Sequence, residues 1–210
     1  MLREDAYGRL KQCLFESAIT PGQLVSQREL AALIGCPLGP TREAIHRLAA
    51  ESVLRVVPQR GIVINDLNLE FIRNVFQLRA LIEREAARAF FAGAERREVQ
   101  SLRQAHQRIL QRATRRIDRT LLAEALRLDW RFHDRIVAAL DNALVQAIYR
   151  VNSDRVRLIQ AKRGYVPERL VSAMREHLAI LDAAMRRGPA AAAAAMDRHL
   201  SESRRWAVRV

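Results

Sequence analysis

The sequence has little of several residue types, and each shortage excludes a class of protein. Its two cysteines, Cys13 and Cys36, form neither a disulfide framework nor a zinc-finger spacing, which fits a reducing compartment. No stretch reaches the roughly 18 consecutive apolar residues that a membrane span needs. The N-terminus lacks the apolar segment of a signal peptide. We therefore expect a soluble, cytoplasmic protein that does not contact membranes.

Lysine and aromatic residues are also scarce. Lys11 and Lys162 are the only lysines among 36 basic residues, and aromatic residues make up 5% of the chain. The formal net charge is +13, but residues 1–65 carry eight basic and six acidic side chains, so most of the excess lies in residues 66–210. This arginine excess either attracts anionic partners or reflects a general amino-acid bias of the source organism. Charge alone therefore does not show that the partner is a nucleic acid. Abundant Ala, Leu and Arg favour helices.

Three short helices are predicted in the first 50 residues. The second begins at a Ser-x-x-Glu capping box, Ser26 to Glu29, and ends at Gly35. The third follows Pro37-Leu38-Gly39, with Pro40 at its first position. The first and third present apolar residues at helical spacing. These are Tyr7, Leu10, Leu14 and Ala18 in the first, and Ala44, Ile45 and Leu48 in the third.

Two β-rich runs follow, residues 54–57 and 62–64, separated by Pro58-Gln59-Arg60-Gly61. This pattern predicts a hairpin. Three helices followed by a hairpin predict a winged helix-turn-helix of about 65 residues, a unit that lays its second motif helix in the major groove of DNA.

The same residues resemble the GntR family of bacterial transcription regulators. The resemblance rests on Pro-Gly-Gln-Leu-Val-Ser-Gln-Arg-Glu-Leu-Ala at 21–31, Pro-Thr-Arg-Glu-Ala-Ile at 40–45, and the wing glycine. It implies that Arg28, Arg42 and Gly61 lie at the DNA, and Arg47 of the same motif is expected to join them. Where the family has Ser-Arg-Thr, this chain has Pro-Leu-Gly at 37–39, which removes an N-cap hydroxyl and one groove-facing arginine.

Residues 66–210 are predicted to be entirely helical. Apolar stripes and breaks at Gly164, Pro167 and Gly188-Pro189 divide them into six segments. These are 69–92, 95–115, 119–140, 142–160, 167–187 and 190–207. Asn68 is expected to cap the first of them.

An ionisable pair lies inside one apolar stripe of this region. Asp129 and His133 are four residues apart and share a helix face with Leu128, Phe132 and Ile136. A buried carboxylate without a partner costs several kcal/mol, so the pair requires a cation or a charged partner from another helix. His177 and His199 fall in two further apolar stripes. Three helices could thus aim one carboxylate and three imidazoles at a common point.

This half resembles the ligand-binding domain called FCD, which is found in the FadR-type branch of the GntR family. The matching motifs are Arg79-x-x-x-Glu83, Asp129-x-x-Phe132-His133, Glu176-His177 and Asp197-Arg198-His199-Leu200. The resemblance implies that Asp129, His133, His177 and His199 bind a divalent transition metal ion, Zn-, Ni- or Mn-like, and that a small carboxylate completes its coordination. The alternative is that these histidines are hydrogen-bonded core residues.

Three more polar residues share faces with apolar side chains and are candidates for the effector. Arg79 and Arg155 could bind a carboxylate through charge-assisted hydrogen bonds, and Asn152 could add a polar contact. An internal salt bridge between Arg79 and Glu83 is an equally good interpretation of the first arginine.

The fold class expected is mainly α, with a winged helix-turn-helix over residues 1–65 and an antiparallel bundle of about six helices over residues 66–210. The leading hypothesis is a transcription regulator that binds a palindromic operator in double-stranded DNA as a homodimer. The bundle would dimerise and would bind the metal and an organic or sugar acid. The alternatives are a metalloenzyme that uses the Asp/His set and a constitutive DNA-binding protein with a structural metal.

Overall fold

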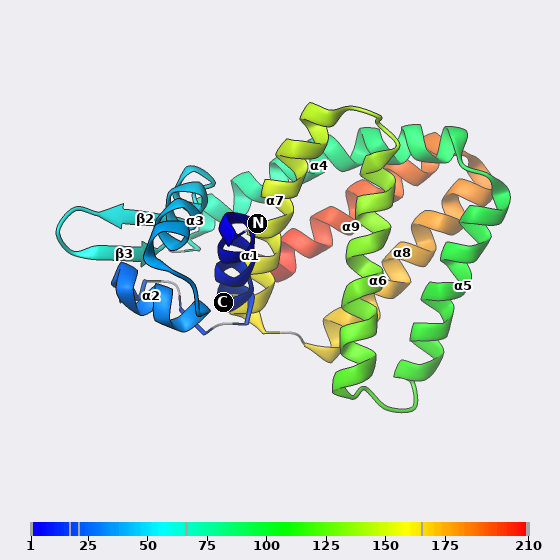
Figure 1. Ribbon diagram of the computed structural model, residues 1–210. Helices are drawn as coiled ribbons and strands as arrows, with labels where there is room; N and C mark the ends of the chain where they lie inside the picture. Colours follow the sequence, from blue (N-terminus) through cyan, green and yellow to red (C-terminus); the bar gives the residue numbers. More distant parts are fainter. Residues whose placement is uncertain (1, 17, 21, 66, 165, 209–210) are drawn as a thin grey trace. The chain divides into compact units, whose positions relative to one another are not determined.

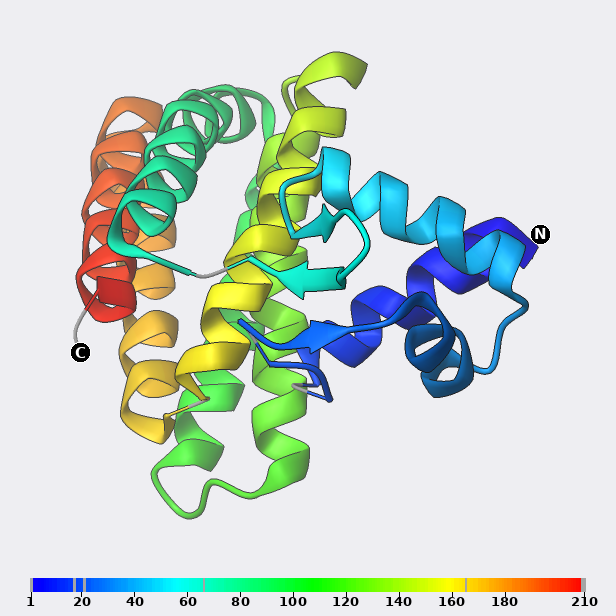
Figure 2. The ribbon, with the colours of Figure 1, turned by 90° about the vertical axis from the view of Figure 1, so that its left-hand side faces the viewer.

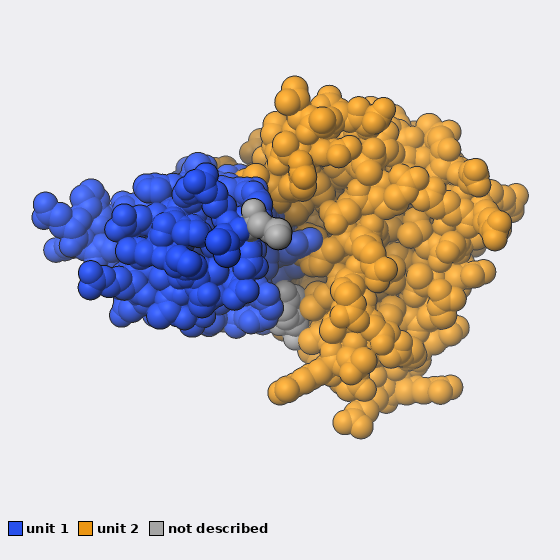
Figure 3. Space-filling view, in the orientation of Figure 1, with its two compact units in different colours: residues 1–71, 154–164 blue, residues 72–153, 165–210 orange. Residues whose placement is uncertain are grey.

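The computed structural model describes residues 2–16, 18–20, 22–65, 67–164 and 166–208. The chain forms two compact units (Figure 3). Unit 1 comprises residues 1–71 and 154–164, and unit 2 comprises residues 72–153 and 165–210. The sequence placed the domain boundary near residue 65, and it did not anticipate that a segment from the second half of the chain belongs to unit 1.

The described residues between 2 and 65, which make up most of unit 1, form three helices and a small antiparallel sheet (Figure 1). These elements are α1 (Leu2–Phe15), β1 (Leu24–Val25), α2 (Gln27–Ile34), α3 (Leu38–Ala50), β2 (Leu54–Val57) and β3 (Gly61–Ile64). The predicted capping box starts α2, because the hydroxyl of Ser26 accepts from Glu29 N at 3.1 Å and the Glu29 carboxylate accepts from Ser26 N at 2.7 Å. Gly35 ends this helix in the left-handed conformation, φ 62°. The predicted start of α2 at the capping box and its predicted end at Gly35 are both confirmed.

The wing is a hairpin of β2 and β3, paired from Leu54↔Ile64 to Val57↔Gly61. The sequence did not predict β1, which pairs with the other edge of β3 and gives the strand order β1-β3-β2. Gly61 stands where these strands meet, with φ +133°. A Cβ at this position would lie 2.7 Å from the carbonyl oxygen of Val25, so the backbone conformation and the close approach of β1 both require glycine.

Helix α3 begins two residues earlier than predicted, at Leu38 instead of Pro40. Pro37 is its N-cap residue and provides no side-chain hydrogen bond. Pro40 therefore occupies the third helical position, where its missing N–H would have had no partner within the helix. The hydroxyl of Thr41 donates to the carbonyl of Pro37 at 2.8 Å and helps to hold this turn.

The described part of residues 67–208 contains the six predicted helices, whose ends differ from the predicted ends by no more than three residues. They make up unit 2, except that residues 69–71 and 154–163 belong to unit 1. These helices are α4 (Leu69–Gly93), α5 (Arg96–Ala113), α6 (Arg119–Ala138), α7 (Ala143–Arg163), α8 (Pro167–Arg187) and α9 (Pro189–Val208). Asn68 caps α4 as predicted, since its Oδ1 accepts from Phe71 N at 2.8 Å. Helices α8 and α9 pack side by side, and α5 packs against α8 (Figure 1 and Figure 2).

The core of unit 2 combines apolar and polar side chains. Phe90, Phe132, Ile136 and Met196 belong to its main apolar cluster and are almost completely buried. The buried polar residues come from all six helices, and they are Arg79, Glu83, His106, Asp129, His133, Asn152, Ser153, His177, His199 and Ser203.

Within the described part of the chain, no helix has the length and apolar character needed to cross a membrane.

Candidate metal centre and DNA-binding surface

Helices α6, α8 and α9 bring together His133, His177 and His199. One ring nitrogen of each lies within 4.8 Å of the other two, and all three side chains are buried. The Nε2 atoms of His177 and His199 are 3.3 Å apart, and the rings of His133 and His199 stack with centroids 5.1 Å apart. The three helices thus direct three imidazoles to one point in the core of unit 2.

Asp129, the fourth predicted ligand, borders this cluster. It lies one turn before His133 in α6, and its Oδ1 is 3.5 Å from Nε2 of His177. Asp129 does not belong to the group of three histidines whose ring nitrogens lie within 4.8 Å of one another. The carboxylate is nevertheless almost buried and faces the cluster through His177, which suits it to be a further oxygen donor.

Two of the histidines have a carboxylate at the opposite ring nitrogen. Nδ1 of His133 is 2.7 Å from Oε2 of Glu83, and Nδ1 of His199 is 2.6 Å from Oε2 of Glu176. A carboxylate favours the proton on the nitrogen that faces it, so each Nε2 keeps its lone pair. Nε2 of His133 is buried and has no hydrogen-bond partner among the described residues.

Burial and neighbouring groups keep the rings of His177 and His199 neutral near pH 7. Burial lowers the pKa of His177 well below its ordinary value, and the neighbouring imidazoles lower it further. Burial also lowers the pKa of His199 to about 4, against the opposing effect of Glu176. Neutral imidazoles with lone pairs directed at one point form the donor set that a divalent transition metal ion binds. The residues present therefore fit such an ion.

Glu83 is held between an arginine and a ligand histidine. Arg79 donates from Nε to Oε1 of Glu83 at 2.5 Å, and both side chains are buried. Burial disfavours the charged carboxylate, but the charge of Arg79 and the contacts with Arg79 and His133 outweigh that effect and lower the pKa of Glu83 to about 2. The predicted internal salt bridge of Arg79 is thus present. Nη2 of the same arginine remains buried without a hydrogen-bond partner among the described residues.

The other two predicted effector residues have different surroundings. Asn152 is buried in unit 2, where its amide nitrogen donates to the carbonyl of Val75 at 3.1 Å. Its Oδ1 has no hydrogen-bond partner within the described chain. Arg155 belongs to unit 1, where Nε and Nη2 donate to the carbonyl of Glu51 at 3.0 and 2.8 Å. The structure gives Arg155 a structural contact in unit 1.

Sequence reasoning did not identify several residues that support the cluster. His106 of α5 contacts His177, and it lies in an apolar stripe with Val99 and Ile109. That stripe is the signal that could have found it. Arg169 holds Glu176 with two hydrogen bonds of 2.8 and 3.2 Å, and it also donates to the hydroxyl of Ser203 at 2.6 Å.

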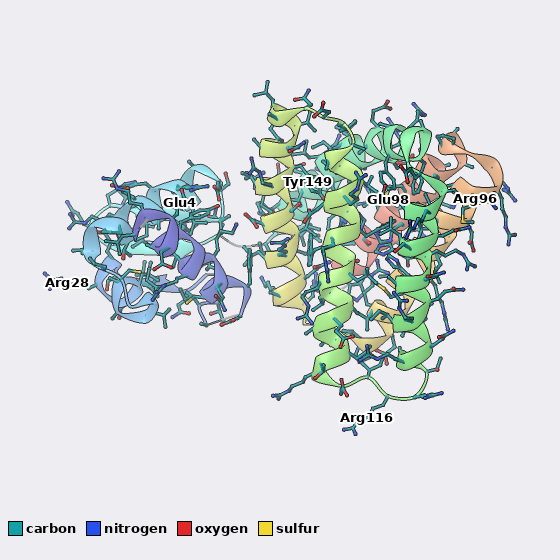
Figure 4. All side chains as sticks on the ribbon, turned by 45° about the vertical axis from the view of Figure 1, so that its right-hand side comes forward. Glu4, Arg28, Arg96, Glu98, Arg116 and Tyr149 are labelled. Carbon is teal, nitrogen blue, oxygen red and sulfur yellow. The ribbon has the colours of Figure 1, made fainter. Side chains whose placement is uncertain are left out.

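The predicted DNA-binding residues lie on unit 1. Arg28 is exposed and points away from the body of unit 1, as Figure 4 shows. Arg42 is exposed and donates to the side chain of Gln27 at 2.9 Å. The guanidinium of Arg47 lies 3.7 Å from the ring centroid of Tyr7 and pairs with Glu4 at 2.9 Å. Arg47 therefore links α3 to α1, in addition to any contact that it makes with DNA.

A three-helix unit with a β-wing, followed along the chain by a helical bundle with a polar centre, is the arrangement of a DNA-binding domain joined to a ligand-binding domain. Two family profiles match the chain: the gntR family of bacterial regulatory proteins over residues 2–64, and the FCD domain over residues 74–202. The chain belongs to the GntR family of transcription regulators and carries an FCD domain, as the sequence motifs predicted.

Curated relatives agree with this assignment, and a solved structure shares the fold. The chain is 28% identical over 205 residues to the HTH-type transcriptional repressor RspR of Escherichia coli K12, covering 96% of this chain and 86% of the repressor. It is 30% identical over 137 residues to the Nta operon transcriptional regulator of Aminobacter aminovorans, covering 65% of this chain and 63% of the regulator. The fold resembles E. coli McbR/YncC, with a TM-score of 0.74, 15% identity, and coverage of 96% and 94% of the two chains.

Proposed function

We propose that this protein is a ligand-responsive transcription regulator that binds a palindromic operator as a homodimer and carries a metal-assisted site for a small carboxylate. It acts on DNA in the bacterial cytoplasm and is not an enzyme. The observation that carries this proposal is the buried group of His133, His177 and His199, because three imidazoles share one point next to Asp129.

The donor set favours a divalent transition metal ion, Zn-, Ni- or Mn-like. Lone pairs of His177 and His199 only 3.3 Å apart would repel one another without a cation between them. Glu83 and Glu176 hold the opposite nitrogens of their histidines, which is the support that metal-binding imidazoles usually receive. The ion would act as a Lewis acid that binds an oxygen of the effector.

The chemical class of the effector follows from buried polar atoms that have no hydrogen-bond partner among the described residues. Three imidazoles and Asp129 would hold the ion and leave it open to further oxygen donors. Nη2 of Arg79 is a buried cationic donor without a partner among the described residues, and it suits the second oxygen of a carboxylate. Oδ1 of Asn152 would accept from a hydroxyl of the same molecule. An organic or sugar acid has both groups. Because Arg155 bonds to Glu51, the proposal relies on Arg79 and Asn152.

The DNA-binding part of the proposal assigns Arg28 and Arg42 to the operator, with Arg47 and Gly61 supporting the recognition helix and the wing. Exposed arginines on a helix-turn-helix reach guanine edges and phosphates. One such domain offers few base contacts, so two-fold symmetric binding to half-sites about one helical turn apart is the expected arrangement.

The metal site is tested by titrating Zn²⁺ into metal-free protein and measuring the stoichiometry by calorimetry and elemental analysis. We expect about one ion per chain, and loss of binding in His133→Ala and in His177→Ala. His46→Ala is the matched control, since it removes an exposed imidazole of unit 1. Wild-type protein that binds Zn²⁺ no better than His133→Ala would contradict the site. Turnover of candidate acids by the loaded protein would favour the metalloenzyme instead.

A further inference from the structure

A fourth buried histidine, His106 of α5, lies outside the proposed ligand set. It is completely buried, and its two ring nitrogens already have partners. Nδ1 is 2.8 Å from the carbonyl oxygen of Leu102, and Nε2 is 3.1 Å from Nδ1 of His177. His106 therefore has no nitrogen left for a metal ion, and its contact is with a ligand.

The positions of the protons in this chain of contacts follow from donor and acceptor chemistry. The carbonyl of Leu102 can only accept, so Nδ1 of His106 must donate. A neutral imidazole carries one proton, and the complete burial of His106 disfavours a charged ring. Nε2 of His106 is then an acceptor, and Nδ1 of His177 must be its donor. The lone pair of His177 consequently falls on Nε2, the nitrogen that faces His199 and Asp129.

We propose that His106 is a positioning residue that fixes the tautomer and ring orientation of His177 for metal binding. This inference rests on the metal site proposed above. It assigns to His106 the function that Glu83 has for His133 and Glu176 has for His199. The difference is charge: a neutral imidazole orients His177 without adding another carboxylate to a core that already contains Asp129.

The packing around the two rings supports a fixed orientation. The ring of Phe132 meets His106 edge to face, with centroids 5.0 Å apart and an interplanar angle of 74°. The same phenyl ring lies against His177, with centroids 4.6 Å apart. The rings of His106 and His177 are themselves nearly perpendicular, at 80°. Phe132 thus restrains both partners of the hydrogen bond while its own side chain is fully buried.

Two substitutions separate the hydrogen bond from the packing. His106→Phe keeps a ring but removes the acceptor, and we expect Zn²⁺ affinity, measured by chelator competition, to fall about 10- to 100-fold. His106→Gln restores an acceptor oxygen and should recover most of the affinity. Ile109→Ala is the control, because it removes apolar side-chain volume from the core on the same helix and leaves the rings of His106, Phe132 and His177 in place. It should lower the melting temperature while leaving Zn²⁺ affinity close to that of wild type.

The tautomer itself can be observed without any metal. Long-range ¹⁵N–¹H NMR spectra of the metal-free protein should show the proton of His177 on Nδ1, and in His106→Phe a substantial share should move to Nε2. A wild-type spectrum with the proton on Nε2 would overturn the proposal, as would His106→Phe with wild-type Zn²⁺ affinity. If the wild type binds no Zn²⁺, the metal site fails, and the spectrum still decides whether His106 orients His177.

Discussion

The helix-turn-helix part of unit 1, within residues 2–65, and the centre of unit 2 bury their polar groups in different ways. In unit 1, the fully buried hydroxyl of Thr41 donates to a carbonyl of its own helix turn, and the hydroxyl of Tyr7 donates to Glu51. In unit 2, Nε2 of His133 and Nη2 of Arg79 are buried without partners among the described residues. Unsatisfied buried donors and acceptors are costly, so an unpartnered imidazole nitrogen within a group of three buried histidines marks a place for a ligand. Unit 1 should therefore fold independently of metal, whereas unit 2 should be stabilised by it.

The largest effect expected from this contrast is metal-dependent stability of unit 2. An ion that binds only the folded site adds about 2.7 kcal/mol when its free concentration is 100 times Kd. Differential scanning calorimetry should show that Zn²⁺ raises the transition of unit 2, and that His133→Ala abolishes this rise. Equal melting temperatures for metal-free and metal-loaded wild type would remove the distinction between the units.

Substitution of Arg42 should affect unit 1 alone. Arg42→Ala is expected to weaken operator binding by about 1 to 3 kcal/mol if the arginine contacts a base, and to leave Zn²⁺ binding unchanged. Fluorescence anisotropy at fixed salt measures this loss. Arg96→Ala removes an equal charge from unit 2 and serves as the control (Figure 4). Equal losses in both variants would indicate that general charge, and not the recognition helix, is responsible.

Alanine substitutions at Gly61, in the wing, and at Gly39, in α3, form a matched pair that tests backbone conformation. Gly61→Ala should destabilise unit 1 by roughly 1 to 3 kcal/mol, because φ is +133° and the new Cβ would approach Val25 O. Gly39→Ala, in the first turn of α3, has no described atom within 4 Å of the new Cβ and should be neutral or slightly stabilising. Chemical denaturation of both variants tests the difference, and equal stability would argue against the close approach of β1.

The smallest effect expected is loss of the capping box. Ser26→Ala removes the acceptor for Glu29 N and should cost about 1 kcal/mol of unit 1 stability. Ser26→Asp retains an acceptor and should retain most of the stability. Both variants should bind Zn²⁺ as wild type does, as measured by the same chelator competition. A change in Zn²⁺ affinity would show that the units are coupled through α2, contrary to the contrast drawn above.

The features that the sequence predicted well are those set by neighbours along the chain. The capping box at Ser26, the stop at Gly35 and the hairpin around residues 58–61 depend on local hydrogen bonds and backbone preferences. The six helices of the second half follow from apolar periodicity. Periodicity also placed His133, His177 and His199 on inward faces, and the structure brings them together.

The features that it missed depend on contacts between distant residues. Strand β1 has two residues and exists through pairing with β3, which no local pattern reports. Periodicity indicated an inward face for Arg155, but it could not indicate that this part of α7 packs in unit 1 against Glu51. The apolar stripe of α5 marks His106 as inward-facing, but its contact with His177 depends on the packing of α5 against α8, which no local pattern reports.

The most direct test of the account is whether the two units communicate through the effector. We would titrate di- and tricarboxylates and sugar acids into Zn²⁺-loaded protein by calorimetry, with and without operator DNA, and repeat the titrations with Arg79→Ala. Linkage requires that an acid and the operator change each other's affinity by the same factor, typically about 5- to 150-fold. The account predicts such a factor for at least one acid, and loss of acid binding in Arg79→Ala. Acids that bind the metal site with identical affinity in both titrations would contradict ligand-responsive regulation.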